Sequence, residues 1–423
     1  MRGFGRAAIG LLATIGVVMV GHGGELSAQP ESTRNVSPEP STASRERDFV
    51  QWINEFRAEA LAQGISGATF DFAFADVGLN QSVLDSNEKQ PEFERQIWTY
   101  VAGAVSTYRI EQGQKLLRQH KALLDDIQQS YGVDRQYLMA IWGLETSFGK
   151  VKGNIYAVEA LASLAFRGRR TAYGRRELLA LLTILEKGYA TKFQLFGSWA
   201  GAMGHTQFIP SAYLAYGVDH DGDGKRDLWS SLPDVFASTA NYLSQARWRP
   251  GQTWGREVVL PEGFDYSLAD RTIVKSVADW TKRGVRAARG TLESDKNIVG
   301  VLLLPGGYNG PAFLVYHNYR ALMTYNNSTA YALAVAHLAD RIKGGATFKG
   351  TWPVDEPALS KADRFDLQGL LIALGYDPGE ADGIVGQKTR AAFRLYQQDI
   401  GEPADGFPTQ TLLARLRRDT AQE

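Results

Sequence analysis

The chain has 423 residues, of which 44% are hydrophobic and 22% charged, the ordinary mix for a folded protein of two or three domains. Lysine plus arginine equals aspartate plus glutamate at 46 each, and this balance argues against a nucleic-acid binder, which usually carries a basic excess. The chain contains no cysteine, which excludes disulfides, thiol catalysis and a lipid anchored to an N-terminal cysteine.

Residues 1–28 have the pattern of a signal peptide. Arg2 and Arg6 precede an apolar run from Ala7 to Val20, and Leu26-Ser27-Ala28 offers a small-residue cleavage site. The run is short for a membrane span, which favours cleavage; an uncleaved signal anchor is the alternative. We therefore predict an exported, periplasmic protein that meets the membrane only through such an anchor. Residues 29–47, rich in Ser, Pro, Glu and Thr, are predicted to be a disordered spacer.

Residues 48–343 have a mainly helical pattern. Apolar residues recur at helical spacing between Phe49 and Phe56, and leucines run almost all round the stretch from Glu177 to Leu185, which predicts a buried helix. Few stretches alternate with period two, and the best strand candidates are Arg256–Leu260 and Val299–Leu304. The sequence therefore predicts a mainly α domain with a minor β component.

A carboxylic acid lies on the apolar face of a helix predicted between Asp134, which can cap its start, and Gly149, which can end it. Leu138, Ile141 and Trp142 form a helical stripe. Glu145 takes the i+7 position of that stripe.

Burial disfavours the charged form of a carboxyl and raises its pKa, as a general acid near neutral pH requires. We expect the carboxyl of Glu145 to be half shielded from solvent and to face a groove. On the helix pattern alone, a structural interpretation is stronger, in which Glu145 is a buried acid paired with an arginine such as Arg169 or Arg170.

Three motifs favour the catalytic interpretation. Trp142–Gly149 (WGLETSFG) resembles the catalytic-glutamate motif of lysozyme-like lytic transglycosylases. Gly197–Ser211 (GSWAGAMGHTQFIPS) resembles the second motif of the membrane-bound lytic transglycosylase B family, and Tyr325–Tyr331 (YNNSTAY) resembles the third. The motifs stand in the family's order and spacing. The resemblance implies a lysozyme-like α+β fold that cleaves peptidoglycan between N-acetylmuramic acid and N-acetylglucosamine.

The resemblance also implies roles for single positions. Glu145 matches the acid/base, while Ser198 and Gln207 match groups near the cleaved bond. Tyr325, Asn326 and Tyr331 match groups that line the sugar sites. Arg169 and Arg170 match an arginine pair expected near the acidic peptide stem. Each has a structural alternative, since tyrosines can be core aromatics, a buried glutamine can satisfy a backbone group, and arginines can be solvated charges.

The chemistry implied by the family uses one carboxylate, whereas glycosidases usually use two. Glu145 first protonates the glycosidic oxygen and then, as a carboxylate, takes the proton from the C6 hydroxyl of the muramic acid. That hydroxyl attacks C1 and closes a 1,6-anhydro ring, so neither water nor a cofactor is required. A hydrolytic muramidase on the same scaffold and a non-catalytic cell-wall-binding protein remain as alternatives.

The segment from Asp219 to Asp227 has the spacing of a calcium-binding loop, and the calcium predicted there would be structural. Ser230 stands at position 12, where an EF-hand has a bidentate glutamate, and related family members suggest Asp234 in its place. The predicted ligands are Asp219, Asp221, Asp223, Lys225 through its carbonyl, Asp227 and Asp234. The alternative is a solvated acidic turn with Lys225 and Arg226 as counter-charges.

The composition changes again near the C-terminus, where residues 344–360 read as a linker rich in Gly, Thr and Pro. Residues 361–420 follow as a small helical unit with an internal repeat, in which Ala381–Ile384 (ADGI) is echoed by Ala404–Phe407 (ADGF). This pattern resembles the type 1 peptidoglycan-binding domain, a three-helix module, and implies glycan strands as the partner. A helical appendage that docks on the main domain is the alternative.

Overall fold

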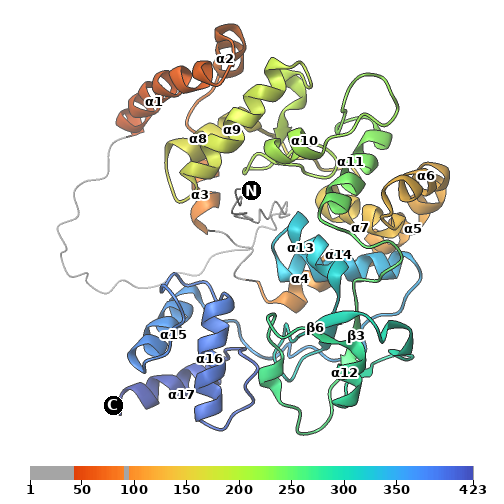
Figure 1. The fold of residues 1–423 in the computed structure, drawn as a ribbon. Coiled ribbons are helices and arrows are strands. Elements are labelled where there is room, and N and C mark those ends of the chain that lie inside the picture. Colours follow the sequence, from red (N-terminus) through yellow and green to blue (C-terminus); the bar gives the residue numbers. More distant parts are fainter. Residues whose placement is uncertain (1–41, 90–94, 423) are drawn as a thin grey trace, which may run out of the picture. The chain divides into compact units, whose positions relative to one another are not determined.

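The structure is a computed structural model that describes residues 42–89 and 95–422 (Figure 1). The predicted signal peptide and most of the predicted spacer lie outside the described residues. The end of the spacer prediction is wrong, because helix α1 (Thr42–Ala62) begins inside it. Arg and Glu are good helix formers, and they extend the helix towards the N-terminus from its first apolar residues. The chain divides into two compact units, whose described parts are 42–89 with 149–235 and 95–148 with 236–422.

The first unit is built on two helices, α8 (Ala157–Phe166) and α9 (Thr171–Glu186), which pack closely. Gly174 permits this approach, because a Cβ there would lie 2.4 Å from the backbone nitrogen of Ala165. A two-stranded antiparallel ladder pairs β1 (Ile155–Tyr156) with β2 (Phe196–Gly197). The other helices wholly within this unit are α1, α2 (Gly67–Phe74), α3 (Gln81–Lys89) and α10 (Pro210–Tyr216).

The second unit is organised around α14 (Thr329–Ile342), which is buried on nearly all sides. Its alanines present little bulk, so neighbouring helices can approach its axis. Those neighbours are α4 (Ile97–Ala104), α5 (Thr107–Gln119), α7 (Arg135–Thr146) and α13 (His317–Tyr325). The helices α6 (Lys121–Tyr131) and α11 (Leu232–Gln245) complete the helical part, although the first turn of α11 belongs to the other unit.

A five-stranded antiparallel sheet in the order β4-β6-β7-β3-β5 belongs to this second unit. Its strands are β3 (Gly255–Val259), β4 (Lys275–Ser276), β5 (Arg286–Ala287), β6 (Val299–Leu303) and β7 (Ala312–Val315). The fully buried Trp280 of α12 (Val277–Lys282) anchors the sheet's core. The two predicted strands are confirmed as β3 and β6. The central strand β7 was missed, because all four of its residues are buried and no period-two alternation marks it.

The C-terminal part of the second unit is a group of three helices, drawn in blue in Figure 1. They are α15 (Lys361–Ala373), α16 (Gln387–Asp399) and α17 (Gln410–Thr420). They enclose a small apolar core that includes Leu367, Phe393 and Leu413. The prediction of a mainly α fold with a small C-terminal three-helix unit is thereby confirmed. Among the described residues, no helix combines the length and apolar character needed to cross a membrane.

The two Asp-Gly turns of the repeat are built alike. In the first, Gln368 accepts a hydrogen bond from the amide of Gly383 (2.8 Å) and donates to Asp382 (3.1 Å). In the second, Gln397 accepts from the amide of Gly406 (2.7 Å) and donates to Asp405 (2.8 Å). Each glycine has a positive φ, 74° and 70°, which explains why glycine recurs there. The sequence repeat is therefore a structural repeat.

Residues 344–360, predicted as a linker, contain no helix or strand, but they pack on the preceding domain. The backbone amides of Lys349 and Gly350 donate to the carboxylate of Glu257 at 2.6–2.8 Å. The Phe348 ring stacks on His337 with centroids 3.8 Å apart. Since these contacts fix the segment, it is not a free tether.

Candidate active site

The motif around Glu145 lies at the end of α7 and has an unusual backbone. Asp134 takes the predicted N-cap position, but the helix ends at Thr146, earlier than expected. Ser147, Phe148 and Gly149 then adopt positive φ values of 50°, 63° and 82°. Non-glycine residues in this region cost about 1–3 kcal/mol each and cluster at functional sites. The strained turn follows directly after the candidate acid.

Phe148 folds back over α7 and explains a glycine of the motif. Its ring meets Trp142 edge to face, with centroids 5.5 Å apart. A Cβ on Gly143 would lie 2.7 Å from the Cζ of Phe148, so any larger residue would displace that ring. Arg109 supports the same turn of α7, because its Nε donates to the carbonyl of Gly143 at 2.9 Å. No sequence motif marks this arginine, and it was not predicted.

Glu145 is more deeply buried than the sequence predicts. Only 8% of Glu145 is exposed, whereas a half-shielded side chain was expected. Every residue of α7 from Tyr137 to Thr146 is buried, so the buried surface of this helix is not a single stripe. The hydroxyl of Tyr331 donates to its Oε1 at 2.6 Å. Burial raises the pKa of the Glu145 carboxyl to about 8, and the Tyr331 hydrogen bond partly opposes that shift. The carboxyl is therefore protonated at neutral pH.

Glu177 on α9 shows what a buried structural acid looks like in this chain. It is fully buried, and its carboxylate accepts from Arg176 Nε (2.9 Å) and from the amide and hydroxyl of Ser211 (2.9 and 3.0 Å). These donors fix the start of α10. Among the described residues of its own unit, Glu145 forms no ion pair and accepts one hydrogen bond, from the neutral phenol of Tyr331. Three donors of the fold thus hold the Glu177 side chain, whereas Glu145 has one.

Tyr331 belongs to a row of aromatic side chains. Tyr325 stacks on it with ring planes 6° apart and centroids at 6.5 Å, and Tyr242 lies 4.8 Å beyond Tyr325. The buried Asn326 caps the end of α13. The structure therefore brings the third motif to Glu145 through Tyr331. Tyr242 was not predicted, because it belongs to no motif and lies on a separate helix, α11.

The second motif lies in the other unit and is tightly folded. A Cβ on Gly197 would fall 1.9 Å from the carbonyl oxygen of Ala202, so only glycine fits. The buried Ser198 hydroxyl accepts from the amides of Ala200 (3.3 Å) and Ala202 (3.1 Å). Ser198 thus organises the turn and still has a hydroxyl proton to donate.

Gln207 combines two signs of a functional group. Its φ is 50°, a strained value for glutamine, and its Nε2 donates to the carbonyls of Lys152 (3.1 Å) and Gly204 (2.9 Å). The buried Oε1 has no hydrogen-bond partner among the described residues. A fixed amide with an unused acceptor is suited to bind a donor group of a ligand.

The arginine pair precedes α9 in a turn. Arg169 is exposed, and the Arg170 guanidinium lies over the ring of Trp199, 5.3 Å from its centroid. Arg170 is thereby associated with the second motif, in which Trp199 follows Ser198.

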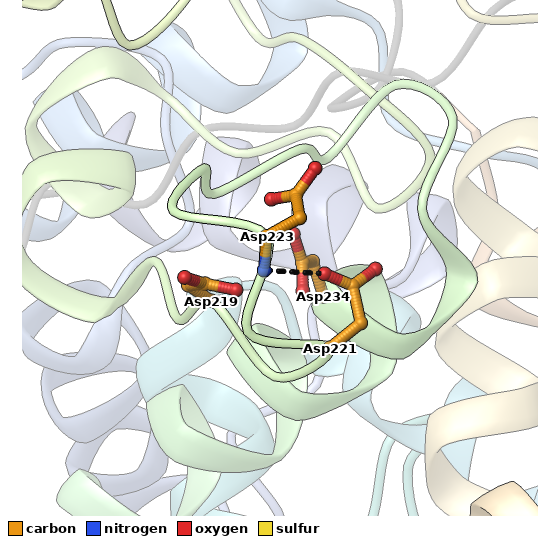
Figure 2. A group of neighbouring side chains, drawn as sticks. All are labelled: Asp219, Asp221, Asp223 and Asp234. Atoms are coloured by element: carbon orange, nitrogen blue, oxygen red, sulfur yellow. Dashed lines mark hydrogen bonds between the residues drawn. The ribbon is translucent and has the colours of Figure 1, made fainter.

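The acidic loop gathers four carboxylates (Figure 2). One oxygen from each of Asp219, Asp221, Asp223 and Asp234 lies within 4.8 Å of the others. Asp234, in the first turn of α11, is fully buried, and its two oxygens accept from the amides of His220 (2.8 Å) and Asp227 (2.7 Å). Burial raises the pKa of Asp234. Oxygen ligands this close fit a hard divalent cation, which would neutralise their mutual repulsion.

One predicted ligand, Asp227, lies apart from this group, whereas the carbonyl ligand predicted for Lys225 stays a prediction. Asp227 lies outside the carboxylate group, and its Oδ1 accepts from the amides of Trp229 (2.8 Å) and Ser230 (2.9 Å). The backbone amide of Lys225 donates to Asp223 at 2.8 Å, a contact of the loop itself. The loop keeps the carboxylates of positions 1, 3 and 5 and the glycine of position 6, Gly224, whose φ is 86°. Its last carboxylate comes from Asp234 on α11 instead of from position 12.

Comparison with known proteins gives two family matches. Residues 48–340 match the transglycosylase SLT domain, and residues 360–416 match a peptidoglycan binding domain. The chain is 30% identical over 239 residues to membrane-bound lytic murein transglycosylase B of Escherichia coli strain K12. That alignment covers 55% of this chain and spans 63% of the relative's length.

Solved structures resemble the chain over a longer stretch. SltB3 from Pseudomonas aeruginosa, crystallised in complex with NAG-anhNAM-pentapeptide, is 50% identical, with a TM-score of 0.84 over 87% of this chain and 99% of that one. The Escherichia coli lytic transglycosylase SLT35 in complex with calcium is 26% identical, with a TM-score of 0.60 over 74% of this chain and 98% of that one. These neighbours confirm the predicted lysozyme-like fold class.

Proposed function

The chain belongs to the transglycosylase SLT domain family, as its motifs predict, and on this premise we propose that it is a periplasmic lytic transglycosylase. It cleaves the β-1,4 bond between N-acetylmuramic acid and N-acetylglucosamine and leaves 1,6-anhydromuramic acid ends. One observation carries the proposal: Glu145 is a buried carboxyl with a pKa of about 8 that has one donor, a neutral phenol, among the described residues of its unit.

The proposed reaction uses this carboxyl twice. Glu145 is protonated at neutral pH and gives its proton to the glycosidic oxygen as the bond from that oxygen to C1 breaks. The Tyr331 hydroxyl then stabilises the carboxylate that remains. The carboxylate takes the proton of the C6 hydroxyl while that oxygen bonds to C1, which restores the acid. An intramolecular nucleophile has a high effective molarity, so no water is needed.

Neutral groups have the proposed task of holding the sugars. The unused Oε1 of Gln207 can accept from the N-acetyl amide of a sugar, and the Ser198 hydroxyl can donate near the cleaved bond. Tyr325 and Asn326 are proposed to line the sugar sites, and Arg169 and Arg170 to meet the carboxylates of the peptide stem. The SltB3 complex supports a glycopeptide ligand, since that protein was crystallised with NAG-anhNAM-pentapeptide.

The rest of the chain supports this task. We assign catalysis to residues 48–343 and wall binding to residues 361–420, where the peptidoglycan binding domain matches. Calcium has no part in the chemistry. It is proposed to hold the loop of Asp219, Asp221, Asp223 and Asp234, as the carboxylate geometry and the calcium complex of SLT35 suggest.

The experiment that tests the function is mass spectrometry of digested sacculi, with the wild type beside Glu145→Gln. Anhydro-muropeptides from the wild type and none from the variant are expected. Reducing muramic acid ends would instead identify a hydrolytic muramidase. Equal solubilisation by the two proteins would mean that Glu145 is not catalytic.

A further inference from the structure

A cavity with a volume of about 820 Å³ lies in the unit that contains Glu145. It is bordered by residues 251–257 at the start of β3, the C-terminal end of α14 and residues 343–348. Asp340 in its wall and Tyr331 beside Glu145 lie on the same helix, and at 1.5 Å per residue they are about 13 Å apart along its axis. The cavity is thus separate from the candidate acid, and its size is that of a ligand pocket.

Two acidic side chains in the cavity wall already accept hydrogen bonds from other groups of the protein. Asp295 accepts from Arg256 Nε (2.8 Å) and from the Tyr316 hydroxyl (3.1 Å). Glu257 accepts the amides of Lys349 and Gly350. These groups have a structural explanation and offer little to a ligand.

Two other side chains in the wall each have an oxygen that accepts no hydrogen bond from a described residue. Asp340 accepts from the indole Nε1 of Trp254 at 2.8 Å through Oδ2, and its Oδ1 accepts no hydrogen bond from a described residue. The buried Oε1 of Gln252 has no hydrogen-bond partner among the described residues either. Burial raises the pKa of Asp340, and Trp254, Arg256 and Lys343 only partly oppose that shift, so its carboxylate would gain from a further cationic donor. An ammonium group supplies both the charge and the donors.

Two cations are also available. Lys343 and Arg289 are exposed cavity residues, and neither forms an ion pair within the described parts of the chain. Among the described residues, the Arg289 side chain makes one hydrogen bond, a long one of 3.4 Å to the carbonyl of Thr347. The cavity thus combines two acceptor atoms that bind no described donor with two exposed cations, of which Lys343 also interacts electrostatically with Asp340.

We propose that this cavity binds an amino acid or short peptide that carries both a free ammonium and a carboxylate. The ammonium donates to Asp340 and Gln252, and the carboxylate pairs with Arg289 or Lys343. Peptidoglycan stem peptides have this chemistry, and naming them as the source rests on the proposed function. A free diamino acid has it too.

Calorimetric titration of the full chain tests the site. The probe is the tripeptide Ala-γ-Glu-diaminopimelate with free termini, and it should bind measurably. Acetylation of both its amines should weaken binding at least tenfold. Asp340→Asn, which keeps an acceptor for Trp254, and Arg289→Gln, which changes an exposed side chain, should each weaken binding of the free peptide by about tenfold.

Equal binding by the wild type and both variants, or by the acetylated peptide, would overturn the proposal. Diaminopimelate alone binding as well as the tripeptide would support the site and assign it to free amino acids. Glu145→Gln should bind the tripeptide like the wild type. Failure of the transglycosylase proposal would show in the wall products, and failure of the cavity would show only in these titrations.

Discussion

The hydroxyl of Tyr331 donates a 2.6 Å hydrogen bond to Oε1 of Glu145 and so links the first turn of α14 to the last turn of α7. Tyr331 is held in place by the N-cap of its own helix, where the Ser328 hydroxyl accepts from the Tyr331 amide at 3.3 Å. This phenol is a neutral donor to the carboxyl. It stabilises the carboxylate form without holding it as firmly as an arginine would.

Tyr331→Phe should therefore slow turnover without unfolding the protein. Loss of a hydrogen bond to a charged group costs about 1.5–3 kcal/mol, so we expect kcat to fall about 10- to 100-fold. Since this bond lowers the pKa of Glu145, the alkaline limb of the pH profile should also move to higher pH. Rates of anhydro-muropeptide release at several pH values measure both effects.

Tyr325→Phe is the matched control. The Tyr325 ring stacks on Tyr331, and no hydrogen bond joins its hydroxyl to Glu145. The alkaline limb of the Tyr325→Phe pH profile should stay where it is in the wild type. A Tyr331→Phe profile that coincides with that of the wild type would show that the phenol does not act on the acid.

The raised pKa of Glu145 predicts a pH-dependent stability. Between its ordinary value of 4.5 and about 8, the folded protein binds more protons at this site than the unfolded chain. The site's contribution is greatest below pH 4.5 and is lost as the pH rises towards 8. Glu145→Gln removes this loss, so the variant should become more stable than the wild type as the pH rises from 5 to 8, by about 1–3 kcal/mol. Urea unfolding at both pH values measures it.

Glu177→Gln provides the contrast between two buried acids. Its carboxylate accepts from Arg176 and Ser211, so the substitution should lower stability at both pH values. Equal effects of the two substitutions would contradict the distinction between a proton-exchanging and a structural acid.

Much of the fold and of the candidate site could be predicted from the sequence. The remainder depends on tertiary contacts that leave no local pattern. The helix of Glu145, the strands β3 and β6 and the repeated Asp-Gly turns leave periodic or turn signatures in neighbouring residues. The bond between Glu145 and Tyr331 joins residues 186 positions apart, and no local pattern encodes it; only the family motifs named both. The positive φ values of Ser147 and Gln207 were unreadable, because tertiary contacts impose them on residues that do not prefer them.

Calcium should raise the melting temperature by mass action on the folded protein. Asp223 is exposed, and its Oδ1 accepts the amide of Lys225, so Asp223→Asn keeps that hydrogen bond and removes one charge of the carboxylate group. The variant should melt like the wild type in chelator and gain less from added calcium. Differential scanning fluorimetry in both conditions measures the shift.

Asp227→Asn serves as the control for the loop. Asp227 lies outside the carboxylate group and accepts the amides of Trp229 and Ser230. Because asparagine keeps the Oδ1 acceptor, this substitution should leave the melting temperature in chelator close to that of the wild type and preserve the calcium-dependent gain. A wild type that melts at one temperature with calcium and chelator alike would argue against a bound ion.

Removal of the C-terminal helices should weaken sacculus binding and preserve chemistry on soluble glycan chains. The cut belongs after Pro357, because Phe348, Lys349 and Gly350 pack on the preceding domain and must stay. Pelleting with purified sacculi measures binding, and anhydro-end release from soluble chains measures chemistry. Equal pelleting of the two proteins would contradict wall binding by residues 361–420.

The packing of Phe148 on Gly143 predicts opposite outcomes for two glycine substitutions. Gly143→Ala places a methyl 2.7 Å from the Phe148 ring, which must then shift together with the strained turn after Glu145. We expect a loss of about 1–3 kcal/mol in stability and a fall in kcat. Gly103→Ala, in the exposed last turn of α4, adds a methyl with no atom within 4 Å and should be neutral or stabilise by up to about 1 kcal/mol. Denaturation and turnover of both variants measure this, and equal behaviour would mean that Phe148 does not hold the turn that follows the acid.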